Sequence, residues 1–224
     1  MTRDTRSTTR RELLAAAGVG GTVAVAGCLG FGGGSNNVDV DTSYDCGDGG
    51  ETIEEAGQPA IGPTDAPVTV QVWEDFSCPH CATWSTEAFP ALREEYVASG
   101  EVRYEHHDFP IPVTDWAWGA ASASRAVYEA TDGETFFEFV KPIYEQQGSY
   151  DFQVAGDAAD SAGVDPCTAV EAARGETYRP VLEADKRAGT DTGVEGTPAV
   201  FVNGQMMSGE RTFENAASLI DEQL

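Results

Sequence analysis

Lysine is nearly absent from this chain of 224 residues. Lys141 and Lys186 are the only two, and 13 basic residues stand against 38 acidic ones, giving a formal net charge of −25. Nucleic-acid backbones are bound by clusters of lysine and arginine, so the charge balance excludes nucleic acid as a partner. The acidic residues are scattered, which indicates a solvated surface. Such a surface repels itself in dilute buffer and is screened at molar salt, so the composition resembles that of halophile proteins.

The sequence also lacks an apolar run long enough for a good membrane-spanning helix. Residues 13–29 come nearest, but glycines interrupt them. Paired arginines, Arg10 and Arg11, precede this run and resemble a twin-arginine export signal. The run ends in Val-Ala-Gly-Cys, which resembles a lipobox with Cys28 as the lipidated residue after cleavage. We therefore expect residues 1–27 to be a signal peptide. A plain signal peptide with an incidental cysteine is the alternative.

A glycine- and asparagine-rich stretch follows Cys28, and its composition is typical of a flexible linker. We expect residues 28–51 to tether the protein, through a lipid on Cys28, to the outer face of the cell membrane. The lipid chemistry is left open. Residues 52–224 remain for one domain with its own core, and no internal repeat divides them.

Cysteine is scarce, and its count is informative. Five are present, and four remain once Cys28 is assigned to a lipid, which allows three pairings. Cys78 and Cys81 stand two residues apart, so a redox function requires that they pair with each other. An oxidising compartment would then favour a structural disulfide between Cys46 and Cys167. Two unrelated thiols are the alternative, because sequence separation says nothing about distance.

The tetrapeptide Cys78-Pro79-His80-Cys81 follows an apolar run and precedes a helical stretch. At such a junction two cysteines can close a reversible disulfide, and the helix N-terminus favours a thiolate at the first sulfur. This is the chemistry of thiol–disulfide exchange. Cys78 is expected to be the exposed nucleophile and Cys81 the more buried resolving thiol. His80 can donate to the Cys78 thiolate or add positive charge, or it is a solvent-facing turn residue.

The residue pattern predicts the order β-α-β, a helical block, and then β-β-α. The expected elements are strands over 68–73 and 101–107, a helix over 82–98 kinked by Pro90, two helical runs within 117–147, short helices over 157–163, 166–174 and 177–188, a strand over 196–202, a hairpin turn at Asn203-Gly204, an edge strand over 205–208 and a final helix over 213–223.

Over residues 52–224 these features resemble the DsbA-like branch of the thioredoxin superfamily. The Cys-x-x-Cys motif, its Pro-His dipeptide and a Gly-Thr-Pro that opens a strand about 115 residues later carry the resemblance. The resemblance implies an α/β protein: a thioredoxin fold with a helical insertion, at about 115–190, between the β-α-β and β-β-α halves. It also implies that no cofactor is needed beyond the redox-active disulfide of Cys78 and Cys81.

The resemblance further implies a cis peptide bond between Thr197 and Pro198, facing the Cys78 sulfur. A proline makes the cis form accessible, and an extended substrate can pair with the Thr197 backbone. A trans proline at the start of a strand is the alternative.

One position departs from the superfamily pattern. The superfamily often places a buried acid six residues before the first cysteine, and Val72 stands there. Glu74 or Asp75 could substitute, yet each is as readily explained as a solvated strand-end residue, so neither is assigned a catalytic role. His106-His107-Asp108 is not assigned as a metal site, because adjacent strand residues face opposite sides.

The resemblance implies an extracytoplasmic thiol–disulfide oxidoreductase. We predict an oxidant, because a stabilised thiolate makes the disulfide reactive. Its partners would be exported proteins that contain cysteine and a membrane partner that reoxidises it. No dimerisation segment is apparent, which favours a monomer. A reductase or isomerase that keeps exported thiols reduced is one alternative. A non-enzymatic metal carrier, using Cys78, Cys81 and a histidine, is the other.

Overall fold

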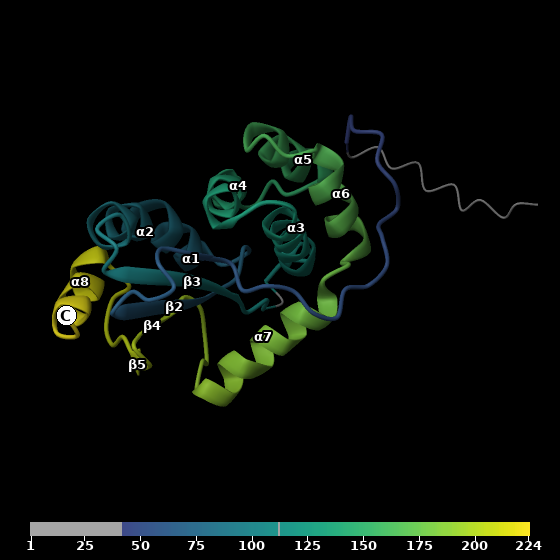
Figure 1. Cartoon of the computed structure of the whole chain (residues 1–224). Coiled ribbons are helices and arrows are strands. Elements are labelled where there is room, and N and C mark those ends of the chain that lie inside the picture. The colour runs from purple at the N-terminus through teal and green to yellow at the C-terminus, as the bar shows by residue number, and fades with distance from the viewer. Residues whose placement is uncertain (1–41, 112) are drawn as a thin grey trace, which may run out of the picture. The chain divides into compact units, whose positions relative to one another are not determined.

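A computed structural model describes residues 42–111 and 113–224 of the chain. Arg10, Arg11 and Cys28 lie outside the described residues, so the export signal and the lipid remain predictions. The described residues belong to one unit, built around a five-stranded sheet (Figure 1). The thioredoxin-like α/β fold with a helical insertion, predicted from the sequence, is confirmed.

The sheet has the strand order β1-β3-β2-β4-β5. The central strand β2 pairs in parallel with β3 and antiparallel with β4, while β1 and β5 close the two edges in antiparallel pairs. The strands are β1 (Ala60–Ile61), β2 (Val68–Glu74), β3 (Val102–Asp108), β4 (Ala199–Val202) and β5 (Gln205–Met206). The two-residue strand β1 was not predicted, because it is too short to show an alternating pattern.

The two faces of the sheet are covered differently. Val70 and Val72 of β2 lie on one face, together with Tyr104 of β3, in the main apolar cluster. Residues of the helical segment 79–97 and of α8 (Phe213–Asp221) complete this cluster. Trp73 and Phe201 lie on the other face, in a smaller cluster. Helix α7 (Arg179–Thr192) packs on that face, where Gly189 lies against the Trp73 ring. Because side chains alternate along a strand, one run of residues supplies both clusters.

The helix after the cysteine motif begins at Pro79, three residues earlier than predicted. It alternates between α-helical and π-helical turns: α1 (Pro79–Thr83), η1 (Trp84–Ala88), α2 (Phe89–Leu92) and η2 (Arg93–Val97). The first π turn ends at Phe89, whose N–H bonds to the carbonyl of Trp84. Pro90, which has no N–H to donate, follows at once. The kink predicted at this proline therefore takes the form of a change in helical pitch.

Five helices separate β3 from β4, and an aspartate begins three of them. The side chains of Asp132, Asp151 and Asp165 each accept a hydrogen bond from a backbone N–H in the first turn, which is the usual way to satisfy a free helix start. The helices are α3 (Ala117–Ala130), α4 (Gly133–Glu145), α5 (Phe152–Ser161), α6 (Pro166–Gly175) and α7 (Arg179–Thr192); α8 (Phe213–Asp221) ends the fold. None of the helices in the described residues is long and apolar enough to span a membrane.

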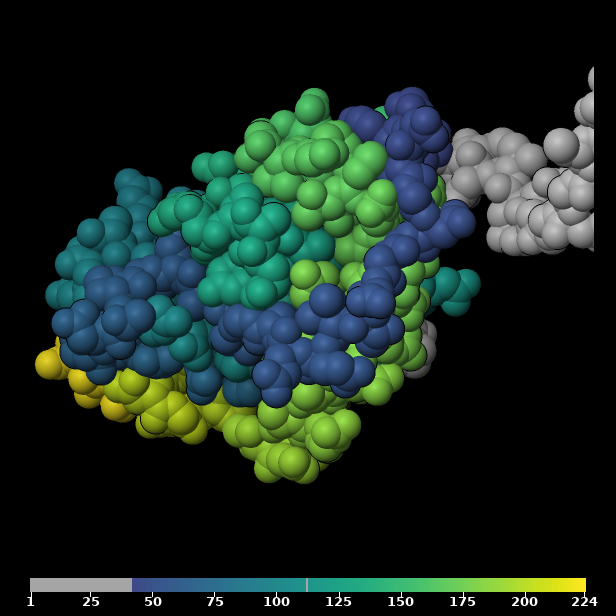
Figure 2. Space-filling model, turned by 45° about the vertical axis from the view of Figure 1, so that its right-hand side comes forward, coloured from purple at the N-terminus to yellow at the C-terminus, as the bar shows by residue number. Residues whose placement is uncertain are grey.

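The N-terminal part of the described chain is packed against the helical block, which corrects the predicted extent of the tether. Figure 2 shows this segment lying on the surface of the domain. The Tyr44 hydroxyl donates to Asp157 at 2.8 Å, and Gly47 N–H donates to Glu171 at 2.7 Å. Residues 42–51, which the prediction placed in the tether of residues 28–51, therefore belong to the folded domain.

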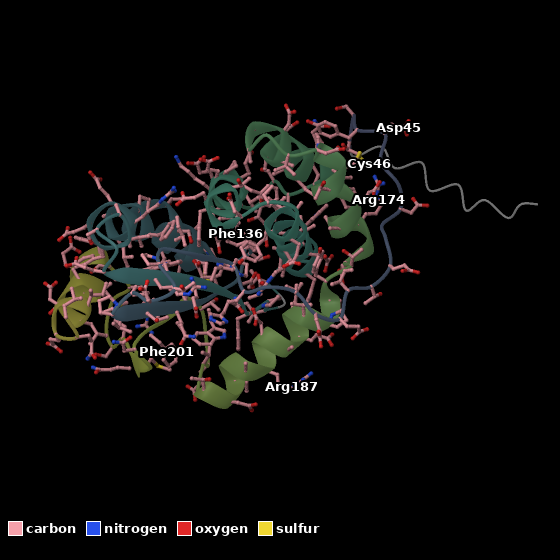
Figure 3. The ribbon with its side chains drawn as sticks, viewed as in Figure 1. Asp45, Cys46, Phe136, Arg174, Arg187 and Phe201 are labelled. Atoms are coloured by element: carbon pink, nitrogen blue, oxygen red, sulfur yellow. A yellow bond between two sulfur atoms is a disulfide. The ribbon has the colours of Figure 1, made fainter. Side chains whose placement is uncertain are left out.

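Cys46 and Cys167 form a disulfide with an S–S distance of 2.05 Å. It joins the N-terminal segment to the first turn of α6, beside Arg174, whose guanidinium donates to the Cys46 carbonyl at 2.9 Å (Figure 3). Of the two alternatives left open by the sequence, the structure contains the bridge.

Candidate active site

The two other cysteines of residues 42–111 and 113–224 lie where the sequence placed them, at the junction of β2 and α1. Cys78 is the residue that caps the helix start, and Pro79 follows at the first helical position. The N–H groups of Cys81 and Ala82 both donate to the Cys78 carbonyl, at 3.0 and 3.1 Å. In this structure the two cysteines are thiols.

Both thiols are buried, which corrects the expectation of an exposed nucleophile. Cys78 is 5% exposed and Cys81 is fully buried. Thr197 lies across the Cys78 sulfur, and the sulfur–carbonyl distance between them is 3.4 Å. The predicted order of burial holds, but a substrate sulfur must approach Cys78 past the backbone of Thr197.

The surroundings of Cys78 favour its thiolate. A hydrogen bond from the Cys81 side chain is the largest influence, and it lowers the pKa of Cys78 to about 5 against the opposing effect of burial. The Thr197 side chain and the backbone N–H groups of Cys81 and His80 lower it further. Because the Thr197 hydroxyl is buried and has no hydrogen-bond partner among the described residues, it is available to donate to this thiolate.

Cys81 has the opposite character. Burial raises its pKa well above the usual range, and its hydrogen bond to Cys78 and the charge of Glu74 raise it further. The pair therefore holds one proton at neutral pH, on Cys81, and one negative charge, on Cys78. A thiolate beside a protonated partner is the arrangement that thiol–disulfide exchange requires.

Of the two interpretations of His80 left open by the sequence, the structure agrees with the solvent-facing residue. Its side chain is exposed, and the contribution of this residue to the Cys78 thiolate comes from its backbone N–H. The described residues show no hydrogen bond between the His80 ring and the Cys78 sulfur. The ring instead lines a groove of about 760 Å³ next to the motif, together with Pro198, Met206 and Arg211.

The Thr197–Pro198 peptide bond is cis. Pro198 precedes β4 and is buried, and the Arg211 guanidinium donates to its carbonyl at 3.3 Å. Met206 is 41% exposed, which is unusual for a large apolar side chain of this domain. The groove thus offers a backbone turn, an apolar side chain and a cation beside a reactive sulfur.

Glu74 and Asp75 are both buried, so the interpretation of either as a solvated strand-end residue was wrong. They are 2% and 1% exposed. The Asp75 carboxylate accepts the Ser77 N–H at 2.7 Å and the Ile111 N–H at 2.9 Å, and the Asp75 N–H lies 3.5 Å from the Cys81 sulfur. Burial raises the pKa of Asp75 to about 6.

Glu74 belongs to a buried chain of charged groups. His106 lies between Glu74, at 3.2 Å, and Asp108, at 3.3 Å, and Asp108 accepts from Arg125 at 2.6 Å. Burial lowers the pKa of His106, but its bonds to Asp108 and Glu74 outweigh burial and raise it to about 9. Arg125 also pairs with Asp185. Because Val72 pairs with His106 and Glu74 with Asp108, these side chains share one face of the sheet with Val72, the position at which the superfamily often has an acid.

His107 lies on the opposite face, as the alternation of strand residues predicts. Its ring stacks on Trp73 with centroids 4.4 Å apart. At the end of β3, His106 and Asp108 are therefore buried and His107 is half-buried. In the described part of the chain, no group of three or more histidine, cysteine or acidic side chains is arranged to hold a metal ion.

Two residues of the helical block support the motif and were not predicted. The Gln147 side chain donates to the carbonyls of Phe76 and Cys78, at 2.7 and 2.8 Å, and the Tyr150 hydroxyl also donates to Phe76. They satisfy the carbonyl groups of the turn that carries Cys78. No local pattern marks them, because their role depends on how the insertion folds back over the motif.

Comparison with known proteins agrees with this geometry. The sequence family described as thioredoxin matches residues 54–222. Disulfide bond formation protein D from Bacillus subtilis is 27% identical over 177 residues, covering 75% of this chain and 78% of that protein. Probable disulfide bond formation protein D from Bacillus anthracis is 30% identical over 183 residues, covering 79% of this chain and 82% of that protein.

Solved structures show the same fold. Oxidised BdbD from Bacillus subtilis superimposes with a TM-score of 0.68 at 24% identity, covering 78% of this chain and 98% of that one. DsbA from Chlamydia trachomatis superimposes with a TM-score of 0.68 at 21% identity, covering 77% of this chain and 95% of that one.

Proposed function

Because this chain belongs to the DsbA-like branch of the thioredoxin superfamily and is a thiol–disulfide oxidoreductase, we propose that it acts as an oxidant that introduces disulfides into exported proteins. The reaction needs no separate cofactor, since the sulfur–sulfur bond of Cys78 and Cys81 holds the oxidising equivalents. Reoxidation falls to a partner in the membrane.

The proposed cycle begins with the disulfide form. A substrate thiolate attacks the Cys78 sulfur, the bond to Cys81 breaks, and Cys81 leaves with the electron pair and takes a proton. A second substrate thiolate then attacks the substrate sulfur of the mixed disulfide. The substrate disulfide forms, and Cys78 leaves as a thiolate. Two electrons have passed from the substrate to the cysteine pair.

The low pKa of Cys78 is the observation that supports this direction. A leaving group with a low pKa leaves faster, and a stabilised thiolate favours the reduced enzyme. Thr197 and Pro198 are proposed to receive the substrate, because the Thr197 carbonyl lies 3.4 Å from the Cys78 sulfur and both residues line the groove. His80 would contribute its backbone N–H and one wall of that groove.

A redox titration against glutathione in molar salt tests the direction. An oxidant has a potential far above the value of about −270 mV for thioredoxin, and a value near −270 mV would instead indicate a reductase. Turnover on a reduced, unfolded protein provides the second measurement. Cys78→Ser should abolish turnover, whereas the paired change Cys46→Ala with Cys167→Ala should leave it in place at a temperature where the variant is folded.

We also propose that the protein is exported by its twin arginines, held outside the cell membrane by a lipid on Cys28, and monomeric. Cys28→Ala is expected to release the protein from the membrane fraction, and Arg10→Lys with Arg11→Lys to leave the precursor inside the cell. A Cys28→Ala protein that stays with the membrane would contradict the lipid anchor. Sedimentation of residues 39–224 tests the monomer.

A further inference from the structure

Asp75 connects three parts of the active site. One carboxylate oxygen accepts from Ser77 in the turn before Cys78, and the other accepts from Ile111 in the loop after β3. The backbone N–H of the same residue lies 3.5 Å from the Cys81 sulfur. Asp75 is therefore in direct contact with the redox pair, although it stands three residues before the first cysteine.

The charge of Asp75 has no positive partner. No ion pair joins it to a basic group within residues 42–111 and 113–224, and its hydrogen bonds come from neutral backbone N–H groups. Glu74 differs, because it contacts the His106 ring, which is protonated at neutral pH. Of the two buried acids beside the motif, Asp75 is the one whose negative charge is uncompensated.

The groups that face Asp75 are themselves negative or neutral. Cys78 faces it from the cap of α1, Cys81 from α1, Asp108 from β3 and Tyr150 from the segment between α4 and α5. The charges of Cys78 and Asp108 add to burial in raising the pKa of Asp75. When Cys78 becomes a thiolate, a second negative charge therefore appears beside a buried carboxylate. Two like charges in one buried site favour protonation of one of them.

We propose that Asp75 is a positioning residue that binds a proton when the Cys78–Cys81 disulfide is reduced. A substrate dithiol carries two hydrogens into the reaction. Its two electrons pass to the sulfur pair, Cys81 keeps one proton, and Cys78 stays a thiolate, so one proton remains. In the proposal Asp75 binds that proton in a fraction of the molecules. The buried site then gains less negative charge on reduction than it would if Asp75 stayed ionised. This rests on thiol–disulfide exchange at Cys78, and it holds in either direction of that exchange.

Infrared difference spectroscopy on the unmodified protein tests the proposal directly. Reduction at about pH 6, near the pKa of Asp75, is expected to produce the C=O stretching band of a protonated carboxylic acid. The band should be absent in Asp75→Asn and present in Asp115→Asn. Asp115 is the matched control, because it is an exposed aspartate in the loop that Asp75 contacts.

The pH dependence of the redox equilibrium gives the second measurement. Each proton taken up per disulfide changes the equilibrium constant tenfold per pH unit, so its slope counts protons. Between about pH 5 and 7, Asp75→Asn should take up fewer protons than the unmodified protein, by up to one. The Cys78 thiolate, followed by its ultraviolet absorbance, should titrate at lower pH once the neighbouring charge is gone.

Absence of the carboxylic acid band in the unmodified protein overturns the proposal, even if Asp75→Asn fails to fold. An unchanged proton count and thiolate titration in a folded Asp75→Asn protein would also overturn it. Neither result bears on the proposed oxidant function, which is decided by the potential at a single pH. Conversely, a potential near that of thioredoxin would contradict the proposed oxidant function. Protonation of Asp75 on reduction would still be tested by the infrared band.

Discussion

Cys78 and Cys81 are one helical turn apart, yet their surroundings move their pKa values in opposite directions. Cys78 caps the helix and receives N–H groups and the Cys81 thiol, whereas Cys81 is fully buried near Glu74. The thiolate exists only in the reduced protein. Interactions that stabilise the thiolate therefore raise the unfolding free energy of the reduced form and leave that of the oxidised form unchanged.

We predict that the difference in unfolding free energy between the reduced and oxidised proteins depends on pH. The pKa of Cys78 is about 5 when folded and about 8.5 when unfolded. A lowered pKa adds stability above the folded pKa, so the reduced form should gain about 1.4 kcal/mol per pH unit from pH 5 to about 8.5. At pH 7 the gain is roughly 3 kcal/mol, which corresponds to about 60 mV in potential. Urea unfolding of both forms measures it, and parallel pH profiles would contradict it.

His106 should produce the opposite trend in the oxidised protein. Its pKa is raised from 6.5 to about 9, so its contribution is complete below pH 6.5 and is lost as the pH rises through 9. We expect roughly 3 kcal/mol of stability to disappear across this window. Urea unfolding of the oxidised protein at a series of pH values checks this. His106→Gln should flatten the profile, while the exposed His80→Gln serves as the control and should keep its slope.

At the scale of elements, the strands and helices follow from local patterns, but their surroundings do not. The alternation in β2 and β3 and the turn at Asn203-Gly204 predict their elements from a few neighbouring residues. The burial of Glu74 could not be predicted, because its partner His106 stands on a parallel strand 32 residues later. The short strand β1 and the packing of residues 42–51 likewise depend on contacts with distant helices and strands.

The residues of the candidate site also fall into those that the sequence predicts and those that it does not. Cys78, Cys81 and the Thr197–Pro198 turn could be predicted, because sequence motifs mark them. Asp75, Gln147 and Tyr150 could not be assigned, because their roles consist of hydrogen bonds to backbone groups. Any residue can present a backbone group, so such partners leave no signal in one sequence.

Helix α7 is expected to tolerate no side chain at Gly189. A Cβ there would lie 2.6 Å from the Trp73 ring and 3.0 Å from Phe109. We predict that Gly189→Ala pushes α7 away from the sheet and costs about 1–3 kcal/mol of unfolding free energy. Urea unfolding followed by tryptophan fluorescence measures this cost. Gly50→Ala is the matched control, since nothing lies within 4 Å of its Cβ; equal effects at the two sites would contradict the prediction.

At the scale of the whole molecule, the Cys46–Cys167 disulfide joins the start of the described chain to α6 across 121 residues. Closing so long a loop restricts the unfolded chain, and the loop-entropy estimate is between 4 and 5 kcal/mol, roughly. Replacing both cysteines by alanine should therefore lower the unfolding free energy by up to this amount. Urea unfolding of the variant and of the unmodified protein provides the measurement. Equal midpoints and slopes would show that the bridge adds no stability.

The net charge of −25 makes a further whole-molecule prediction. Raising the ionic strength from about 0.1 to 1 M shortens the Debye length from about 10 to 3 Å and screens the repulsion between surface carboxylates. The melting temperature is therefore expected to rise steeply with sodium chloride. Sucrose at the same osmolality is the control, because it does not screen charge. A melting temperature that responds equally to both would contradict the electrostatic explanation.

The disulfide also constrains the order in which the protein matures. Cys46 and Cys167 enclose Cys78 and Cys81 in the sequence, so the native pairs are nested. As the chain emerges from the ribosome, Cys46 first meets Cys78 and Cys81, and its proper partner appears only after the residues of β2, β3 and three helices of the block have been made. A cysteine oxidised in order of appearance would join the wrong sulfur. If the chain folds first, Cys78 and Cys81 are buried in their own turn, and Cys46 can then be oxidised with Cys167 without this wrong pairing.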